Sequence, residues 1–199
     1  FNWVWAFHFF KDSPELDEVF WQRFTCSLYD HLFYLENNWE VYEKTSNHYL
    51  SDLLGYYALT WFFADCTGMQ KKAAWCHKQF LKEFQKQVQK DGTDYEGSTA
   101  YHGLVTEIFY HFYLLAQEQG HMLPADFADG LSAMFTFIDW LTIQDKKRVT
   151  IGDDDSGKML FYGITPDLVA QMKRNFLQGK DSSFLKSLVW QSIKMKPCT

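Results

Sequence analysis

The chain has 199 residues, of which 47% are hydrophobic and 19% aromatic, with only 11 glycines and 4 prolines. This composition excludes a disordered or fibrous protein, and the length favours one domain with a single core. The net charge of −6 argues against a surface that binds nucleic acid without sequence preference.

Apolar residues recur at helical spacing through most of the chain, and almost no segment alternates with the period of two that strands show. Asp12, Ser13 and Pro14 form a helix-start signal, while Gly68 and Gly120 are stop signals. After an opening helical stretch, the expected helices cover residues 15–38, 48–64, 70–89, 98–119, 124–143, 165–177 and 182–193. We therefore predict an all-α fold of antiparallel helical hairpins in a single domain, 1–199, as a bundle, a repeat array or part of an (α/α) toroid.

The first ten residues, FNWVWAFHFF, contain no initiator Met, no basic region and no small-residue cleavage site. They suggest a helix that is entered midway, so we expect the chain to be cut from a longer protein. No segment reaches the length of a membrane span without a charge, which predicts no membrane span. The four cysteines lack CxxC spacing, and Cys26, Cys66 and Cys76 are expected as buried free thiols.

The chain is unusually rich in aromatic residues, with 8 Trp, 11 Tyr and 19 Phe. Packing in a helical core accounts for such rings, and a groove that stacks on sugars is the alternative. Lys78, Lys82, Lys86 and Lys90 form an i,i+4 stripe, which we interpret as the solvated face of an amphipathic helix.

Polar side chains gather at the start of two of the expected helices. TSNHYLSD places Asn47 and His48 at one start, and DGTDYEGSTAYH places Tyr101 and His102 in the first turn of another, with Glu96 just before it. If consecutive helices pair antiparallel, these two helices run in the same direction and their N-terminal ends share one face. The five residues could then converge, where helix N-termini also favour an anion such as a carboxylate.

Each cluster also has a purely structural explanation. Ser46 or Asn47 can cap one helix, and Ser98 or Thr99 the other. His48 can be a satisfied interior histidine, and Tyr101 an ordinary packed aromatic with a bonded hydroxyl. A site is therefore indicated by the pair of clusters on one face rather than by any single residue.

The segment GDDDSG, residues 152–157, has aspartates at alternate positions, as calcium loops do. The other ligand positions of an EF-hand loop are absent, so we interpret the segment as a solvated turn. The sequence also lacks HExxH, zinc-type histidine spacing, GxSxG, a Walker loop and a dinucleotide glycine motif. We predict no metal site and no cofactor.

Three stretches, NHYLSDLLGYYALTWFF, DGTDYEGSTAYHGLVTEIFYH and IGDDDSG, occur in this order and resemble the N-terminal α/α-toroid domain of heparinase II/III-like polysaccharide lyases. That group includes bacterial alginate and oligoalginate lyases. FNWVWAFHFF is similar to the Asn-Trp helix of the same domain, which suggests Trp3 as a substrate contact. The resemblance covers residues 1–160, and the tail 161–199 matches less clearly.

The resemblance implies β-elimination at a uronic acid, in which a base removes the C5 proton and the 4-linked sugar leaves. Asn47 matches the position that binds the uronate carboxylate, and His48 a position used for substrate contact or proton transfer. Tyr101 matches the tyrosine that protonates the leaving oxygen and that also serves as base in some accounts. Glu96 matches a recurrent acid before that tyrosine, with an orienting role, and His102 is a further substrate-contact candidate. A tyrosine base requires a neighbouring cation or hydrogen-bond donor that lowers its pKa from about 10.

Complete lyases of this group add a β-sandwich domain that closes the cleft and supplies a further catalytic histidine. We therefore expect a partner domain in the same parent chain, an acidic polysaccharide or oligosaccharide as substrate, and a periplasmic or secreted location. The alternative hypotheses are a non-catalytic helical module that binds glycan or protein, and an unrelated helical-repeat scaffold. The unrelated scaffold predicts that Asn47 and Tyr101 lie far apart.

Overall fold

The computed structural model describes residues 1–143, 148–155, 157, 159 and 168–178. Over these residues all the regular secondary structure is α-helical, and strand-like pairing is limited to two isolated bridges. The helices are α1 (Asn2–Phe10), α2 (Glu18–Asn37), α3 (Asn47–Phe62), α4 (Met69–Gln87), α5 (Thr99–Glu118), α6 (Ala125–Trp140) and α7 (Leu168–Leu177). The all-α prediction is confirmed, whereas closure into a toroid stays a prediction. The helix expected over 182–193 lies outside the described residues.

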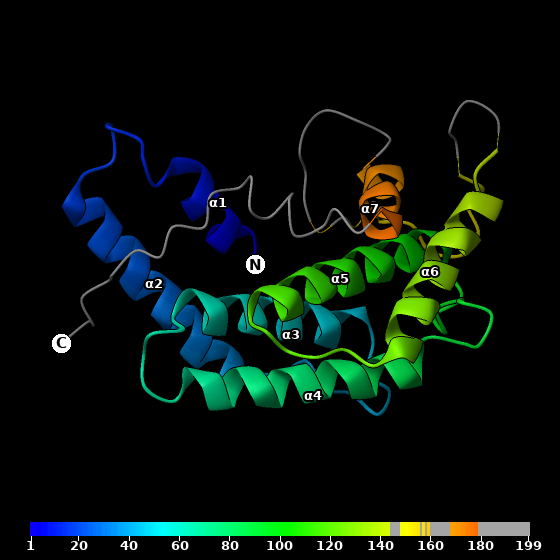
Figure 1. Cartoon of the computed structure of the whole chain (residues 1–199), viewed down its shortest axis with the longest axis horizontal. Helices are drawn as coiled ribbons and strands as arrows, with labels where there is room; N and C mark the ends of the chain where they lie inside the picture. Colours follow the sequence, from blue (N-terminus) through cyan, green and yellow to red (C-terminus); the bar gives the residue numbers. More distant parts are fainter. Residues whose placement is uncertain (144–147, 156, 158, 160–167, 179–199) are drawn as a thin grey trace.

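Helices α3 and α4 form an antiparallel hairpin (Figure 1). In the α3/α4 hairpin, Cys76 near the middle of α4 donates from its thiol to the carbonyl of Leu53, 3.3 Å away. Further along α4, the carboxylate of Glu83 accepts a hydrogen bond from the hydroxyl of Thr45, just before α3 begins. Higher numbers in α4 therefore face lower numbers in α3, which is the antiparallel arrangement.

Helices α3 and α5 lie side by side and run in the same direction. Asn47 at the start of α3 bonds to Glu96 just before α5, and ten residues later the ring of Tyr57 lies 5.5 Å from that of Phe112. From the first contact to the second, the residue numbers increase in both helices, so the helices are parallel. This result confirms the expectation that the two N-terminal ends share one face of the molecule.

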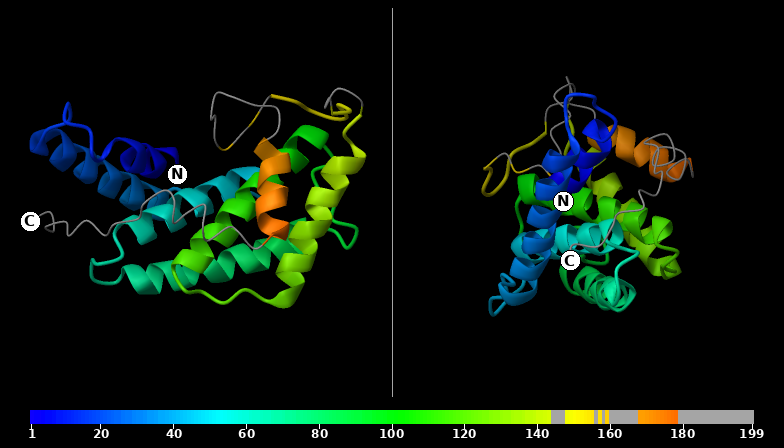
Figure 2. Two further views of the ribbon diagram at one scale, coloured as in Figure 1. Left: turned by 45° about the horizontal axis from the view of Figure 1, so that its top comes forward. Right: turned by 90° about the vertical axis from the view of Figure 1, so that its left-hand side faces the viewer.

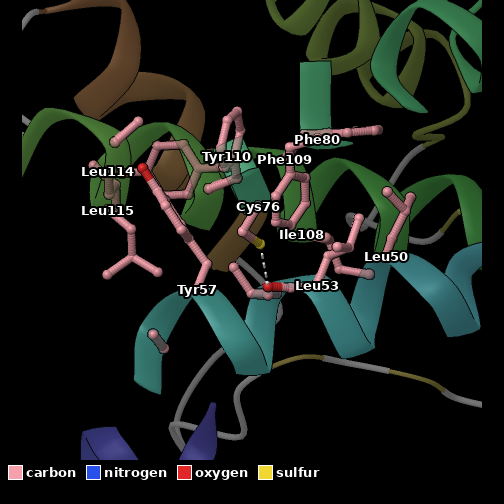
Figure 3. Close-up of a cluster of buried hydrophobic side chains, with 14 of the residues drawn as sticks. Leu50, Leu53, Tyr57, Cys76, Phe80, Ile108, Phe109, Tyr110, Leu114 and Leu115 are labelled. Atoms are coloured by element: carbon pink, nitrogen blue, oxygen red, sulfur yellow. Dashed lines mark hydrogen bonds between the residues drawn. The ribbon is translucent and has the colours of Figure 1, made fainter. Parts of the chain in front are cut away.

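The core lies between α3, α4, α5 and α6. Figure 3 shows the part in which α3 and α5 face each other, with Cys76 and Phe80 entering from α4. Phe80 stacks on Phe112 of α5 with ring centroids 4.2 Å apart, and Phe84 packs against Phe127 of α6 at 4.3 Å. Burying rings of this size supplies much of the apolar stabilisation of a helical domain.

Helix α2 begins later than the sequence signal suggested. Asp17 is the N-cap, and its carboxylate accepts a hydrogen bond from the backbone N–H of Phe20 at 2.7 Å. Ser13 instead closes a separate turn, in which its carbonyl accepts from the N–H of Leu16. The expected start after Ser13 was therefore wrong, because a second acidic cap three residues beyond Pro14 satisfies the first turn directly.

The connection between α4 and α5 is buried at Gly92, Asp94 and Ser98. Gly92 has a φ of 86°, and a Cβ at this position would lie 2.5 Å from the backbone carbon of Ala133 in α6. Only glycine combines this backbone conformation with so close an approach. The turn is therefore fixed against α6, and it holds the following segment, which carries Glu96, in place.

Helices α1 and α2 lie at one end of the molecule, with α6 and α7 toward the other (Figure 2). The N-terminal end of α1 rests on the middle of the α3/α5 pair, where the ring of Phe1 lies 5.0 Å from that of His111. Along the described part of the chain, no helix has the combination of length and apolar character that crossing a membrane requires.

Candidate active site

The entrance of α3 is held by a carboxylate from the segment before α5. Glu96 accepts hydrogen bonds from the backbone N–H of Asn47 at 2.8 Å and from its side-chain nitrogen at 3.2 and 2.9 Å. A carboxylate at a helix N-terminus is stabilised by the free N–H groups and the helix dipole. Because ionised carboxylate oxygens only accept, the amide nitrogen of Asn47 must face Glu96, which fixes the orientation of this amide.

The segment that carries Glu96 is itself fastened to the chain before α3. The hydroxyl of Tyr95 donates to the carbonyl of Thr45 at 2.5 Å, and the hydroxyl of Thr45 donates to Glu83, also at 2.5 Å. Glu83 is a buried carboxylate that also accepts from Gln87 at 2.8 Å. The position of Glu96 therefore rests on a polar network that reaches into α4.

Asp94 lies beneath Glu96 and is almost completely buried. Its Oδ2 accepts from the backbone N–H of Glu96 at 3.2 Å. Burial raises the pKa of Asp94 to about 7, and the negative charge of Glu96 adds to this effect. Asp94 therefore changes its charge near neutral pH, directly under the residue that orients Asn47.

His48 is the second residue of α3 and projects to the outside, with its side chain 60% exposed. Its Nδ1 lies 2.7 Å from Oε2 of Glu40, in the segment between α2 and α3. This pairing leaves Nε2 as the ring nitrogen that an incoming molecule can reach. The interior-histidine explanation for His48 therefore does not hold.

The N-cap residue of α5 also forms a hydrogen bond to a loop that is distant in sequence. The hydroxyl of Ser98 accepts from the backbone N–H groups of Ala100 and Tyr101, each at 3.2 Å, and donates to the carbonyl of Asp153 at 2.6 Å. The backbone N–H of Thr99 donates to the carbonyl of Ile151 at 3.0 Å. The segment at residues 151–155, called the aspartate loop from here on, therefore lies over the start of α5.

That loop places carboxylates around Tyr101. The Tyr101 hydroxyl donates to Oδ2 of Asp155 over a long 3.4 Å. Desolvation raises the pKa of Tyr101, and the charges of Asp155, Asp153 and Glu96 raise it further. This is the opposite of the lowered pKa that a tyrosine base requires, so the phenol stays protonated and able to donate at neutral pH.

His102, next in sequence to Tyr101, lies in the interior. Its Nδ1 accepts from the backbone N–H of Asp94 at 3.2 Å, and its Nε2 donates to the carbonyl of Met134 at 3.1 Å. Its side chain is only 2% exposed, and burial lowers its pKa. With both nitrogens occupied, the ring joins the α4–α5 connection to α6, and this geometry gives no support to a substrate contact.

Trp3 is 59% exposed on α1, and its ring packs edge-on against Phe24 of α2 at 6.1 Å. The start of α1 lies beside Gly55, which is eight residues beyond Asn47 and so about 12 Å further along α3. The structure therefore joins Asn47, His48, Glu96 and Tyr101 at one end of the α3/α5 pair and places Trp3 on another part of the molecule.

Sequence reasoning missed two neighbours of these residues. Glu40 lies in a segment without regular structure, and no spacing in the sequence pointed to His48 as its partner. Asp155 was noticed only as a calcium-like pattern, yet it contacts the Tyr101 hydroxyl. Among the side chains that the structure describes, no group of three or more His, Cys, Asp or Glu is arranged to hold a metal ion.

The residues of this site lie within a region that matches a known protein family. The family described as heparinase II/III N-terminus matches residues 2–160, which include both helix entrances and the aspartate loop. No curated protein and no solved structure matches the chain. The match covers most of the sequence, and the chain belongs to the heparinase II/III N-terminal domain family.

Proposed function

We propose that this domain is the helical half of a polysaccharide lyase that cleaves uronate-containing glycans by β-elimination. One observation supports the proposal above all others. The bond between Glu96 and Asn47 joins the entrances of α3 and α5, and so brings Asn47 and His48 to the same end as Tyr101, 54 positions away in sequence. The family membership makes a lyase the leading activity for a site of this composition.

Tyr101 acts as the general acid in this proposal. The carboxylates of Asp155, Asp153 and Glu96 favour its neutral form, which carries the proton that the leaving oxygen needs. The sequence left open whether this tyrosine acts as acid, base or both. The direction of its pKa shift supports the acid role alone.

His48 acts as the base. Its Nε2 takes the C5 proton, the electron pair of that C–H bond forms the C4–C5 double bond, and the C4–O bond breaks. Tyr101 then donates its proton to the leaving oxygen. Both residues return to their starting states by proton exchange with water.

Asn47 stabilises the negative charge that develops on the substrate carboxylate next to C5. Glu96 holds its amide group, and the amide N–H that does not point at Glu96 is the donor we assign to the substrate carboxylate. A fixed donor of this kind stabilises developing negative charge without reorganising. A β-sandwich domain of the same parent chain, which the family resemblance implies, would close the cleft over these residues.

The decisive experiment is Tyr101→Phe in the full-length parent protein, assayed on alginate, heparan-like chains and bacterial capsular polymers. Product formation is followed through the ultraviolet absorbance of the unsaturated uronate. We expect kcat to fall by about 10²- to 10⁴-fold, the contribution of a positioned general acid. Tyr29→Phe, on the exposed face of α2, is the matched control and retains full activity.

Full activity in Tyr101→Phe contradicts the proposal. Glycan binding without turnover, equally strong in Tyr101→Phe, would instead establish the alternative of a non-catalytic binding module.

A further inference from the structure

We infer that Glu40 is a positioning residue that selects the reactive tautomer of His48. This inference deepens the proposed function and rests on it for its catalytic part. Oε2 of Glu40 lies 2.7 Å from Nδ1 of His48. Because an ionised carboxylate can only accept, the shared hydrogen sits on Nδ1, and Nε2 keeps its lone pair.

The side chains of both Glu40 and His48 are exposed to solvent. The Glu40 side chain is 47% exposed and that of His48 60%, and exposed ion pairs contribute little stability. A positioning role therefore requires that the backbone at Glu40 be fixed by something other than this pair.

Two contacts provide that fixation. The backbone N–H of Glu40 donates to Oδ2 of Asp52 at 2.8 Å, and Asp52 lies one turn after His48 on the same face of α3. The preceding residue, Trp39, packs edge-on against Tyr56 with ring centroids 5.2 Å apart. The chain is thus anchored on α3 immediately before Glu40, and its carboxylate is held over the first turn of that helix.

In the described part of the chain, Glu40 contacts His48 and Asp52 interacts with it electrostatically. Burial raises the pKa of Asp52, and the negative charge of Glu40 adds to this rise. The hydrogen bond from the Glu40 backbone and the proximity of His48 act against it. Both carboxylates lie near the ring that gains a positive charge when Nε2 takes a proton. Glu40 thus sets which nitrogen is free beforehand and stabilises the imidazolium afterwards, as carboxylates paired with catalytic histidines do.

The pairing has an observable that needs no substrate. In protein labelled with ¹⁵N-histidine, at about pH 8, the nitrogen shifts report which ring nitrogen carries the hydrogen. We expect His48 of the unsubstituted protein to be mainly the Nδ1–H tautomer. In Glu40→Ala the signal moves toward the Nε2–H form. Glu43→Ala, which changes an exposed glutamate three residues later, leaves it in place.

The catalytic part is tested in the full-length parent protein with the same two variants and with Glu40→Asp. Glu40→Ala is expected to lower kcat about tenfold and to leave KM within about twofold, because only the base is affected. Glu40→Asp, which keeps a carboxylate, restores part of the loss if the shorter side chain still reaches Nδ1. The melting temperatures of all variants stay close to that of the parent, since an exposed pair contributes little stability.

An Nε2–H tautomer in the unsubstituted protein, or a tautomer unchanged in Glu40→Ala, overturns the pairing. An unchanged kcat in Glu40→Ala overturns the catalytic role. If the expected tautomer is found in a parent protein that shows no turnover at all, the proposed function fails while the pairing stands.

Discussion

The entrances of α3 and α5 look alike in sequence and differ in almost every physical respect. Each has a serine cap and a histidine close behind it. At α3, His48 is exposed and has one ring nitrogen in contact with Glu40. At α5, His102 is buried and both of its ring nitrogens are bonded.

The difference follows from where the two helices lie and how far into each helix the histidine falls. Helix α5 is enclosed by α3, α4 and α6, so a residue in its first full turn that faces α6 is interior. His48 is only the second residue of α3 and faces the irregular segment that holds Glu40. A histidine at a helix start is therefore accessible or buried according to its place on the helix rather than its sequence motif.

The largest effect expected in a test of this comparison is a loss of turnover when His48 is replaced. His48→Ala in the full-length parent protein should lower kcat about 10²- to 10⁴-fold, because the proposed base is lost. The melting temperature should change little, since the side chain is exposed. Kinetics on the preferred uronate glycan and a thermal melt provide the two measurements. Turnover at the parental rate would remove His48 from the mechanism.

The converse substitution should act on stability. His102→Ala leaves the N–H of Asp94 and the carbonyl of Met134 without their buried partners and opens a cavity. We expect the free energy of unfolding to fall by about 2–4 kcal/mol, measured by urea denaturation at neutral pH. The kcat per folded molecule should be preserved to within a few-fold. A stable His102→Ala protein that has lost activity would reverse the roles assigned here to the two histidines.

The smallest effect concerns Asp94 and appears only as a dependence on pH. Its folded pKa of about 7 lies above the ordinary value of 3.8, so the folded state binds the proton more tightly between these two values. Protonated Asp94 therefore stabilises the fold at low pH, and this contribution is lost as pH rises through 7. His8, His77 and His111 act in the opposite direction. Desolvation lowers their pKa values, so protonating them in acid destabilises the fold.

Comparison with Asp94→Asn isolates this contribution. The free energy of unfolding of the variant relative to the unsubstituted protein should increase by about 1–3 kcal/mol between about pH 4 and pH 8. Chemical denaturation at a series of pH values measures it, with Asp126→Asn on the exposed surface as control. If the difference in free energy of unfolding between Asp94→Asn and the unsubstituted protein does not change with pH, Asp94 is ionised over the whole pH range tested.

Much of the fold was predictable because it depends on local signals. Helical periodicity and the glycines at 68 and 120 located α3, α4 and α5 to within about two residues, and antiparallel pairing correctly placed the two entrances together. The start of α2 was wrong because Asp17 competes with Ser13 as a cap.

The partners within the site were less predictable. Glu40, Asp155 and Glu83 reach their targets across irregular segments, where no periodicity relates a residue to its partner. The burial of His102 depends on the position of α6, which no pattern around Tyr101 encodes. The catalytic roles of Asn47, His48 and Tyr101 and the contact role of Trp3 remain predictions.

Gly92 and its close approach to Ala133 have a consequence for the motions that accompany binding. Loops that carry functional residues often open and close, but this one is fastened to α6 at its turn and to the chain before α3 through Tyr95. Its amides are expected to exchange with solvent as slowly as those of the helices around it. We therefore expect this loop to keep its position when a ligand binds.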